Sequence, residues 1–111
     1  MREFDYDLKK YEKITGKLTL SIPTYRQRLK MIKDCQFQID NKTGQVNINS
    51  DTIDSIIKLL DVTKEHFKKI DLRYGTDIHV KNFDQLESYS EFDTLLIEAA
   101  SSILNAGKLG K

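Results

Sequence analysis

The chain has 111 residues, 39% of them hydrophobic and 32% charged, with 18 Lys or Arg against 17 Asp or Glu. This length allows one hydrophobic core, and the composition is that of a folded domain rather than a disordered segment. We therefore expect a single domain over residues 1–111. The balanced charge argues against a dedicated binder of nucleic acid or membranes, because both need a clear positive surplus.

The charge is distributed unevenly along the sequence. Residues 1–37 carry nine Lys or Arg and five Asp or Glu, whereas residues 82–111 carry two and five. Two solvated faces at opposite ends of the chain are the simpler interpretation, and head-to-tail self-association is the alternative.

Cysteine use and hydropathy bear on the cellular compartment. Cys35 is the only cysteine, so no intrachain disulfide forms and nothing indicates an oxidising environment. The first residues lack the apolar segment of a signal peptide, and no apolar run approaches the roughly 18 residues of a membrane-spanning helix. We expect a cytoplasmic protein that does not contact membranes.

The first half of the chain alternates between strand and helix signals. Phe4, Tyr6 and Leu8 alternate with charged residues, and residues 17–22 alternate again after a turn signal at Thr15–Gly16. This pattern predicts an N-terminal β-hairpin. Pro23 then introduces a predicted helix over residues 24–35.

The predicted helix 24–35 has two distinct faces. Positions three and four apart place Tyr25, Leu29 and Ile32 on an apolar face. The same geometry gathers Arg26, Lys30 and Lys33 on a basic face, which is the best candidate for contact with a phosphate backbone.

Two further hairpins and a second helix follow. Residues 36–40 and 45–49 alternate around Asn41–Gly44, and residues 70–74 and 78–80 alternate around a turn at 75–77. Between these hairpins, Ser50 or Asp51 is expected to cap a helix. Its predicted buried stripe consists of Ile53, Ile56, Ile57, Leu60 and Phe67.

The chain closes on an acidic link at residues 82–87 and a strongly amphipathic helix. Ser90 is the expected N-cap, Gly107 is the expected C-terminal stop, and residues 108–111 form a tail that we expect to be flexible. The apolar stripe of this helix consists of Phe92, Leu95, Leu96, Ala99, Ala100, Ile103 and Leu104. The predicted class is α+β: a small single domain with an N-terminal β-hairpin, two or three helices, further short hairpins and a C-terminal amphipathic helix.

No residue pattern in the chain indicates a catalytic site. His66 and His79 lack the spacing of a metal site and are expected at the surface, and Cys35 is expected to be buried and inert. The carboxylate pairs Asp5/Asp7 and Glu91/Asp93 fall at an outward strand face and a helix start, which are structural positions. We predict no catalytic residue, no metal, no cofactor and no enzymatic activity.

Three segments together resemble a known family. These are the helix entry at residues 21–29, the link at residues 83–86 and the ending at residues 104–111. They resemble the small tail assembly chaperones of long-tailed bacteriophages. The resemblance implies a cytoplasmic helper, absent from the finished virion, that coats the tape measure protein, keeps it soluble and recruits tail tube subunits.

A chaperone of this kind needs an apolar surface rather than a catalytic group. The candidates for partner binding are Ile103, Leu104 and Leu109, to the extent that they escape the core. The alternatives are a structural tail or head completion component of the virion, paired through its edge strands, and a small nucleic-acid-associated regulator that uses Arg26, Lys30 and Lys33.

Overall fold

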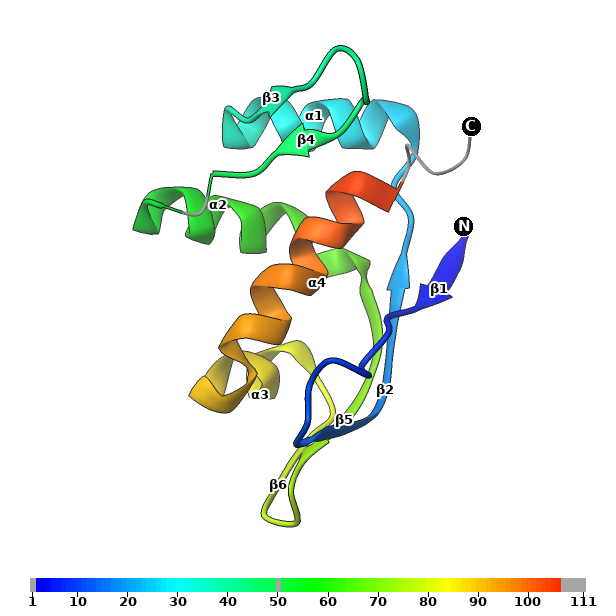
Figure 1. The fold of residues 1–111 in the computed structure, drawn as a ribbon, viewed down its shortest axis with the longest axis vertical. Helices are drawn as coiled ribbons and strands as arrows, with labels where there is room; N and C mark the ends of the chain where they lie inside the picture. Colours follow the sequence, from blue (N-terminus) through cyan, green and yellow to red (C-terminus); the bar gives the residue numbers. More distant parts are fainter. Residues whose placement is uncertain (1, 50, 107–111) are drawn as a thin grey trace.

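The computed structural model describes residues 2–49 and 51–106. An antiparallel sheet with strand order β1-β2-β5-β6 forms one layer, and the helices lie to one side of it (Figure 1). The strands are β1 (Glu3–Asp5), β2 (Ile14–Ser21), β5 (Phe67–Tyr74) and β6 (Ile78–Val80).

The long central strands β2 and β5 hold the sheet together. Leu18 and Leu72 point inward and are fully buried, whereas Lys17 lies opposite Asp71 on the outer, exposed face. This two-residue period is the reason why the alternating sequence forms strands with one wet face. The predicted N-terminal hairpin is confirmed, since β1 pairs antiparallel with β2.

Gly16 does not form the predicted turn. It lies within β2, opposite Leu72, with a φ of +113°. A Cβ atom at this position would lie 2.0 Å from the backbone oxygen of Asp71. Glycine is therefore required here by close approach to the neighbouring strand, and a turn signal in the sequence does not reveal that requirement.

Helix α1 (Tyr25–Cys35) begins as predicted after Pro23. Its N-cap is Thr24, whose side chain accepts a hydrogen bond from the Gln27 backbone while the Gln27 side chain accepts one from the Thr24 backbone. This capping box satisfies donors that the first helical turn leaves free.

The buried face of α1 differs from the predicted one. Tyr25 and Leu29 are exposed, and the face turned to the core consists of Arg28, Met31, Ile32 and Cys35. Arg28 donates hydrogen bonds through Nε to the Leu104 carbonyl at 2.5 Å and through Nη2 to the Gly44 carbonyl at 2.9 Å. In this orientation the buried guanidinium satisfies two backbone carbonyls, which offsets the cost of burying a charged side chain.

Helix α2 (Ile53–Thr63) is capped by Thr52, whose side chain accepts from the Ser55 backbone, rather than by Ser50 or Asp51. Ser50 itself lies outside the described residues. A 3-10 turn, η1 (Lys64–His66), ends the helical segment, and Phe67 opens β5 instead of extending the helix stripe.

The two later hairpins are confirmed. Strands β3 (Gln38–Ile39) and β4 (Val46–Asn47) form a separate two-stranded sheet, and β5 pairs with β6 around the turn at residues 75–77. The Val46 N–H donates at 2.8 Å to the Asn105 side chain, which joins the first of these hairpins to the C-terminal helix.

The acidic segment before the last helix is itself a helix, α3 (Phe83–Ser88), capped by Asn82. The predicted Ser90 cap is wrong, because residues Ser90–Phe92 form the 3-10 turn η2 and α4 (Asp93–Ala106) continues directly from it. The predicted stop at Gly107 and the tail at 108–111 lie outside the described residues.

Helix α4 forms the centre of the core. It packs against α1, α2 and α3, and its predicted apolar stripe is buried throughout. Phe92 is fully buried and its ring meets the Tyr74 ring edge-on, at a centroid distance of 6.2 Å. The α+β class, the N-terminal hairpin and the C-terminal amphipathic helix are therefore confirmed.

Candidate functional site

Cys35 is buried, as the sequence predicts. Burial raises the pKa of its thiol, because a thiolate loses hydration in this environment, and the negative charge of Asp34 acts in the same direction. A thiol with a raised pKa is a poor nucleophile at neutral pH. Cys35 therefore acts as a core residue.

His66 is not the surface residue that the sequence predicts. It is buried, and its Nδ1 shares a hydrogen bond of 2.8 Å with the Ser21 hydroxyl. Burial lowers the pKa of His66, so the neutral ring is favoured. The pair resembles a nucleophile and base by distance, but Ser21 has no exposed surface through which a substrate could reach it.

His79 lies far along the sheet from His66, on the outer face of β6. Its Nε2 approaches Asp71 Oδ1 at 2.5 Å across the β5–β6 pair. The hydrogen bond from His79 lowers the pKa of Asp71. This contact joins two strands, and among residues 2–49 and 51–106 no group of three or more His, Cys, Asp or Glu is placed to hold a metal ion.

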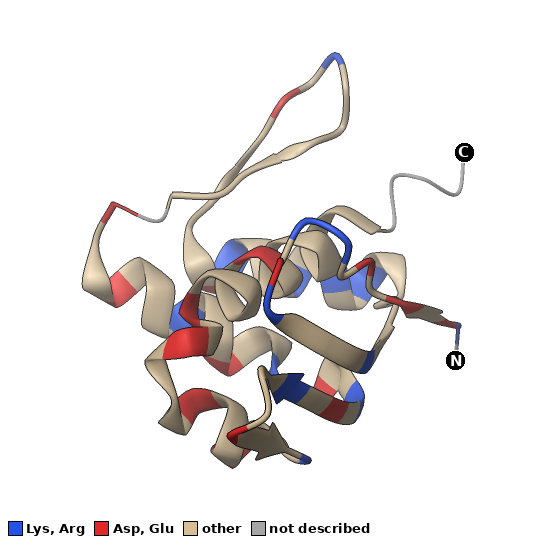
Figure 2. Ribbon diagram, turned by 60° about the horizontal axis from the view of Figure 1, so that its bottom comes forward, with Lys and Arg blue, Asp and Glu red and all other residues tan. Residues whose placement is uncertain are grey.

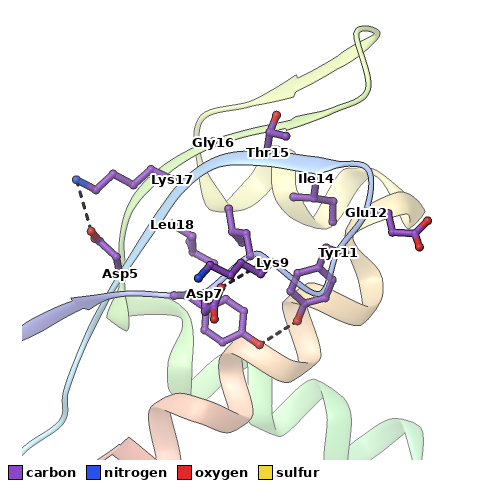
Figure 3. A pocket seen from close by; sticks show the side chains of 12 residues that line it. Asp5, Asp7, Lys9, Tyr11, Glu12, Ile14, Thr15, Gly16, Lys17 and Leu18 are labelled. Carbon is purple, nitrogen blue, oxygen red and sulfur yellow. Dashed lines mark hydrogen bonds and ion pairs between the residues drawn. The ribbon is translucent and has the colours of Figure 1, made fainter.

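A shallow hollow of about 600 Å³ lies inside the loop between β1 and β2 (Figure 3). At its rim the Tyr6 and Tyr11 hydroxyls lie 2.9 Å apart, and Tyr11 donates at 2.6 Å to Glu98 on α4, which also pairs with Lys10 at 3.1 Å. The Tyr11 hydrogen bond lowers the pKa of Glu98. The network fastens the loop to α4.

The sequence contains two candidate carboxylate pairs. Asp5 and Asp7 line the hollow but make local contacts, and Glu91 and Asp93 are not part of its lining. Asp5 accepts from the Thr19 hydroxyl and lies 3.7 Å from Lys17, and Asp7 accepts from the Lys9 backbone (Figure 3). These contacts stabilise the hairpin and do not direct two carboxylates at a common point. Glu91 and Asp93 are exposed around the start of α4.

Two of the three residues suggested for partner binding, Ile103 and Leu104, are not at the surface. Ile103 and Leu104 are fully buried in α4, so neither escapes the core, and Leu109 lies outside the described residues. The reason is that α4 packs against α1, α2 and α3, and its apolar side chains lie in the same core as Leu18 and Leu72 of the sheet.

Helix α2 leaves large apolar side chains uncovered at the surface, as does α1 at Tyr25 and Leu29. Ile53 is 76% exposed and Ile57 is 50% exposed. Beside them, Ile56 is half-buried, and Leu60 is half-buried and packs against the core. We call these four residues the α2 stripe. They are the residues that the sequence predicts to be buried, and the prediction is wrong for Ile53 and Ile57.

The orientation of α2 explains this exposure. The helix turns Leu59 and Thr63 into the core, and the Thr63 hydroxyl donates to the Leu59 carbonyl at 2.7 Å, so a polar side chain can be buried there. Since each residue rotates by about 100°, Ile53 and Ile57 then point away from the core. A buried threonine takes a place that the apolar pattern alone would assign to isoleucine.

Acidic groups border the α2 stripe. Asp54 and Asp61 lie next to Ile57 on the exposed side of the helix, with the exposed Lys58 between them. At the far end, Lys64 follows Leu60 by one turn and lies 3.8 Å from Asp84 of α3. Residues 82–106, which include α3 and α4, contain five Asp or Glu and no Lys or Arg. Acidic positions are red and basic positions blue in Figure 2.

The basic face predicted on α1 is present at the surface. Arg26, Lys30 and Lys33 are all exposed, while Arg28 of the same helix is used inside the core. The exposed Tyr25 and Leu29 adjoin this face, so α1 presents apolar and basic groups together.

Comparison with protein-family models, with curated proteins and with solved structures gave no match. In the described part of the chain, no helix has the length and apolar character needed to cross a membrane. The α2 stripe, with its acidic border, is accordingly the candidate functional site that rests on the structure itself.

Proposed function

We propose that this protein is a non-enzymatic binding protein that holds an amphipathic helix of a partner on the α2 stripe. The observation that carries the proposal is the exposure of Ile53 and Ile57 on a helix whose apolar stripe continues into the core. Large apolar side chains in a row on one helix face are a common form of helix-binding surface.

The acidic border defines the partner further. Asp54 and Asp61 lie beside the stripe, and the following helices are acidic as well. A partner helix with an apolar stripe flanked by Lys or Arg would match both the apolar and the charged parts of this surface. Apolar residues at three- and four-residue spacing are the chemistry that such a surface recognises.

Within this class we propose a tail assembly chaperone that binds the tape measure protein of a long-tailed bacteriophage in the host cytoplasm and recruits tail tube subunits. The support is the sequence resemblance together with an uncovered apolar stripe, which suits a helper for a long helical client. The alternative of a virion component that pairs by its edge strands has less support. Strands β1 and β6 are only three residues long, and charged residues flank or occupy them, which protects such edges.

The first test is co-expression with the tape measure protein encoded beside this gene, with the solubility of the tape measure and co-elution from a sizing column as readouts. Solubilisation and co-elution are expected. A tape measure that stays insoluble, with the small protein appearing in purified virions, would replace the chaperone by the structural alternative.

The second test isolates the stripe. A fluorescent helical peptide with Leu at three- and four-residue spacing and flanking Lys is titrated with the wild type and with Ile53→Ser/Ile57→Ser. We expect the variant to weaken binding about tenfold or more. The matched control is Ile39→Ser, an exposed isoleucine on β3 that should not change the affinity. Equal affinities for all three proteins would remove the stripe as the binding site.

A further inference from the structure

Helices α1 and α2 present the same outward pattern with opposite charge. Both have 11 residues, and in each the first and fifth residues are exposed and apolar: Tyr25 and Leu29 in α1, Ile53 and Ile57 in α2. The second and ninth residues are basic in α1 and acidic in α2. They are Arg26 and Lys33 in α1, and Asp54 and Asp61 in α2. The sixth residue on the same flank is an exposed lysine in both helices, Lys30 and Lys58, so the flanks are opposite in charge at two of these three positions.

These two faces do not meet within one molecule. The sides of α1 and α2 that approach each other line a hollow of about 290 Å³. Its lining residues are Gln27, Lys30, Met31 and Asp34 of α1, Val62 of α2, and Glu65 and His66 of η1. At about 100° per residue, Tyr25 and Leu29 lie on the opposite side of α1 from this hollow. Each face is therefore available to another molecule.

We propose that the resident occupant of the α2 stripe is α1 of a second copy of this chain. Tyr25 and Leu29 of one copy would cover Ile53 and Ile57 of the next. The two helices would pack antiparallel. In an antiparallel pair, the charged residues that flank the apolar face on the same side of each helix lie opposite each other, as the flanking positions of coiled coils do. The basic flank of α1 then lies opposite the acidic flank of α2.

The contact joins two different surfaces, so it is heterologous. Each copy that offers α1 to one neighbour still has a free α2 stripe for another, and such contacts produce closed rings or open chains. The inference rests on the proposed function only in using the same α2 stripe. It adds that the stripe is protected by a neighbouring copy until a client helix with the same apolar and basic pattern displaces it.

The test is a charge-reversal experiment on the intact chain, with mass measured by analytical ultracentrifugation at increasing protein concentration. One variant is Arg26→Glu/Lys33→Glu and the other is Asp54→Lys/Asp61→Lys. In each variant alone, α1 and α2 carry like charges, so we expect the association constant to fall about tenfold or more relative to wild type. An equimolar mixture should associate again, because each acidic α1 finds a basic α2 and the reverse.

Wild-type association should also weaken as salt is raised. A wild type that stays monomeric up to millimolar concentration would overturn the inference, as would assembly that neither reversal changes. All four positions are exposed, and far-ultraviolet circular dichroism of each variant checks that the fold is retained.

The same proteins separate this inference from the proposed function. Arg26→Glu/Lys33→Glu leaves the α2 stripe intact, so it should bind the helical peptide even though it no longer self-associates. Peptide binding by a monomeric wild type would contradict the self-association and leave the proposed client binding in place. Assembly without any peptide binding would contradict the client binding and leave the self-association in place.

Discussion

Helices α2 and α4 have the same apolar sequence pattern but differ in how far their apolar side chains are buried. Both have isoleucine or leucine at three- and four-residue spacing. In α4 these side chains are buried along the whole helix, whereas in α2 Ile53 and Ile57 remain exposed. The difference arises from neighbours: α4 packs against α1, α2 and α3, while α2 is covered mainly by α1 and α4.

An apolar stripe on a helix favours burial but does not specify which neighbour buries it. In α4 the stripe is buried by other elements of the same chain. In α2 it is buried only in part, and we propose that another molecule covers the exposed Ile53 and Ile57. Removing side chains from the two helices should therefore give effects of very different size.

The largest effect is expected in the core helix. Leu104→Ala should lower the free energy of unfolding by about 2–5 kcal/mol, because it leaves a cavity beside a fully buried position. Ile57→Ala on α2 should cost less than about 1 kcal/mol, since half of that side chain is already in water. Urea denaturation measures both values, and equal losses would contradict the distinction between the helices.

The next effect concerns the tie between α1 and the end of α4. Arg28→Met removes hydrogen bonds to the carbonyls of Leu104 and Gly44 and should cost about 2 kcal/mol. Arg26→Met, on the exposed side of the same helix, is the control and should change stability by less than about 0.5 kcal/mol. Equal losses of stability in the two variants would show that water satisfies the Leu104 carbonyl equally well, and would contradict the prediction.

A smaller effect is expected at the end of the α2 segment, where His66 is buried. Its pKa in the folded protein lies below the ordinary histidine value of 6.5, so the unfolded chain binds more protons below that pH. Its contribution to stability is complete above about pH 6.5 and is lost as the pH falls toward the folded pKa.

We expect Tm to fall between about pH 7.5 and pH 5.5, and His66→Gln to reduce that dependence. Asp71 and Glu98, whose pKa values are also lowered, lose their contributions only in more acidic solution. Thermal unfolding at the two pH values gives the answer, and an unchanged slope in the variant would assign the dependence to another group.

The smallest effect belongs to the exposed ends of the two surface helices. Tyr25→Ser and Ile53→Ser should each change the free energy of unfolding by less than about 0.5 kcal/mol in dilute protein. Both side chains are more than two-thirds exposed. A larger loss that appears only at high concentration would reveal their burial between copies.

Several features of the fold can be predicted from short segments of the chain. Alternation located the strands, Pro23 and its neighbours located α1, and the stripe from Phe92 to Leu104 gave a buried C-terminal helix. The sequence also indicated a buried Cys35. These features depend on local propensity and on the period of apolar residues, which are properties of short segments.

Other features depend on contacts between segments that are far apart in the chain. Gly16 lies within a strand, where it approaches the Asp71 backbone of β5, a neighbouring strand that is distant in the sequence. Arg28 faces inward, where it binds the carbonyls of Leu104 and Gly44. The exposed α2 stripe follows from the same cause, since the rotation of α2 depends on what packs against Leu59 and Thr63. A segment encodes which of its faces is apolar, and its neighbours in space decide which face is covered.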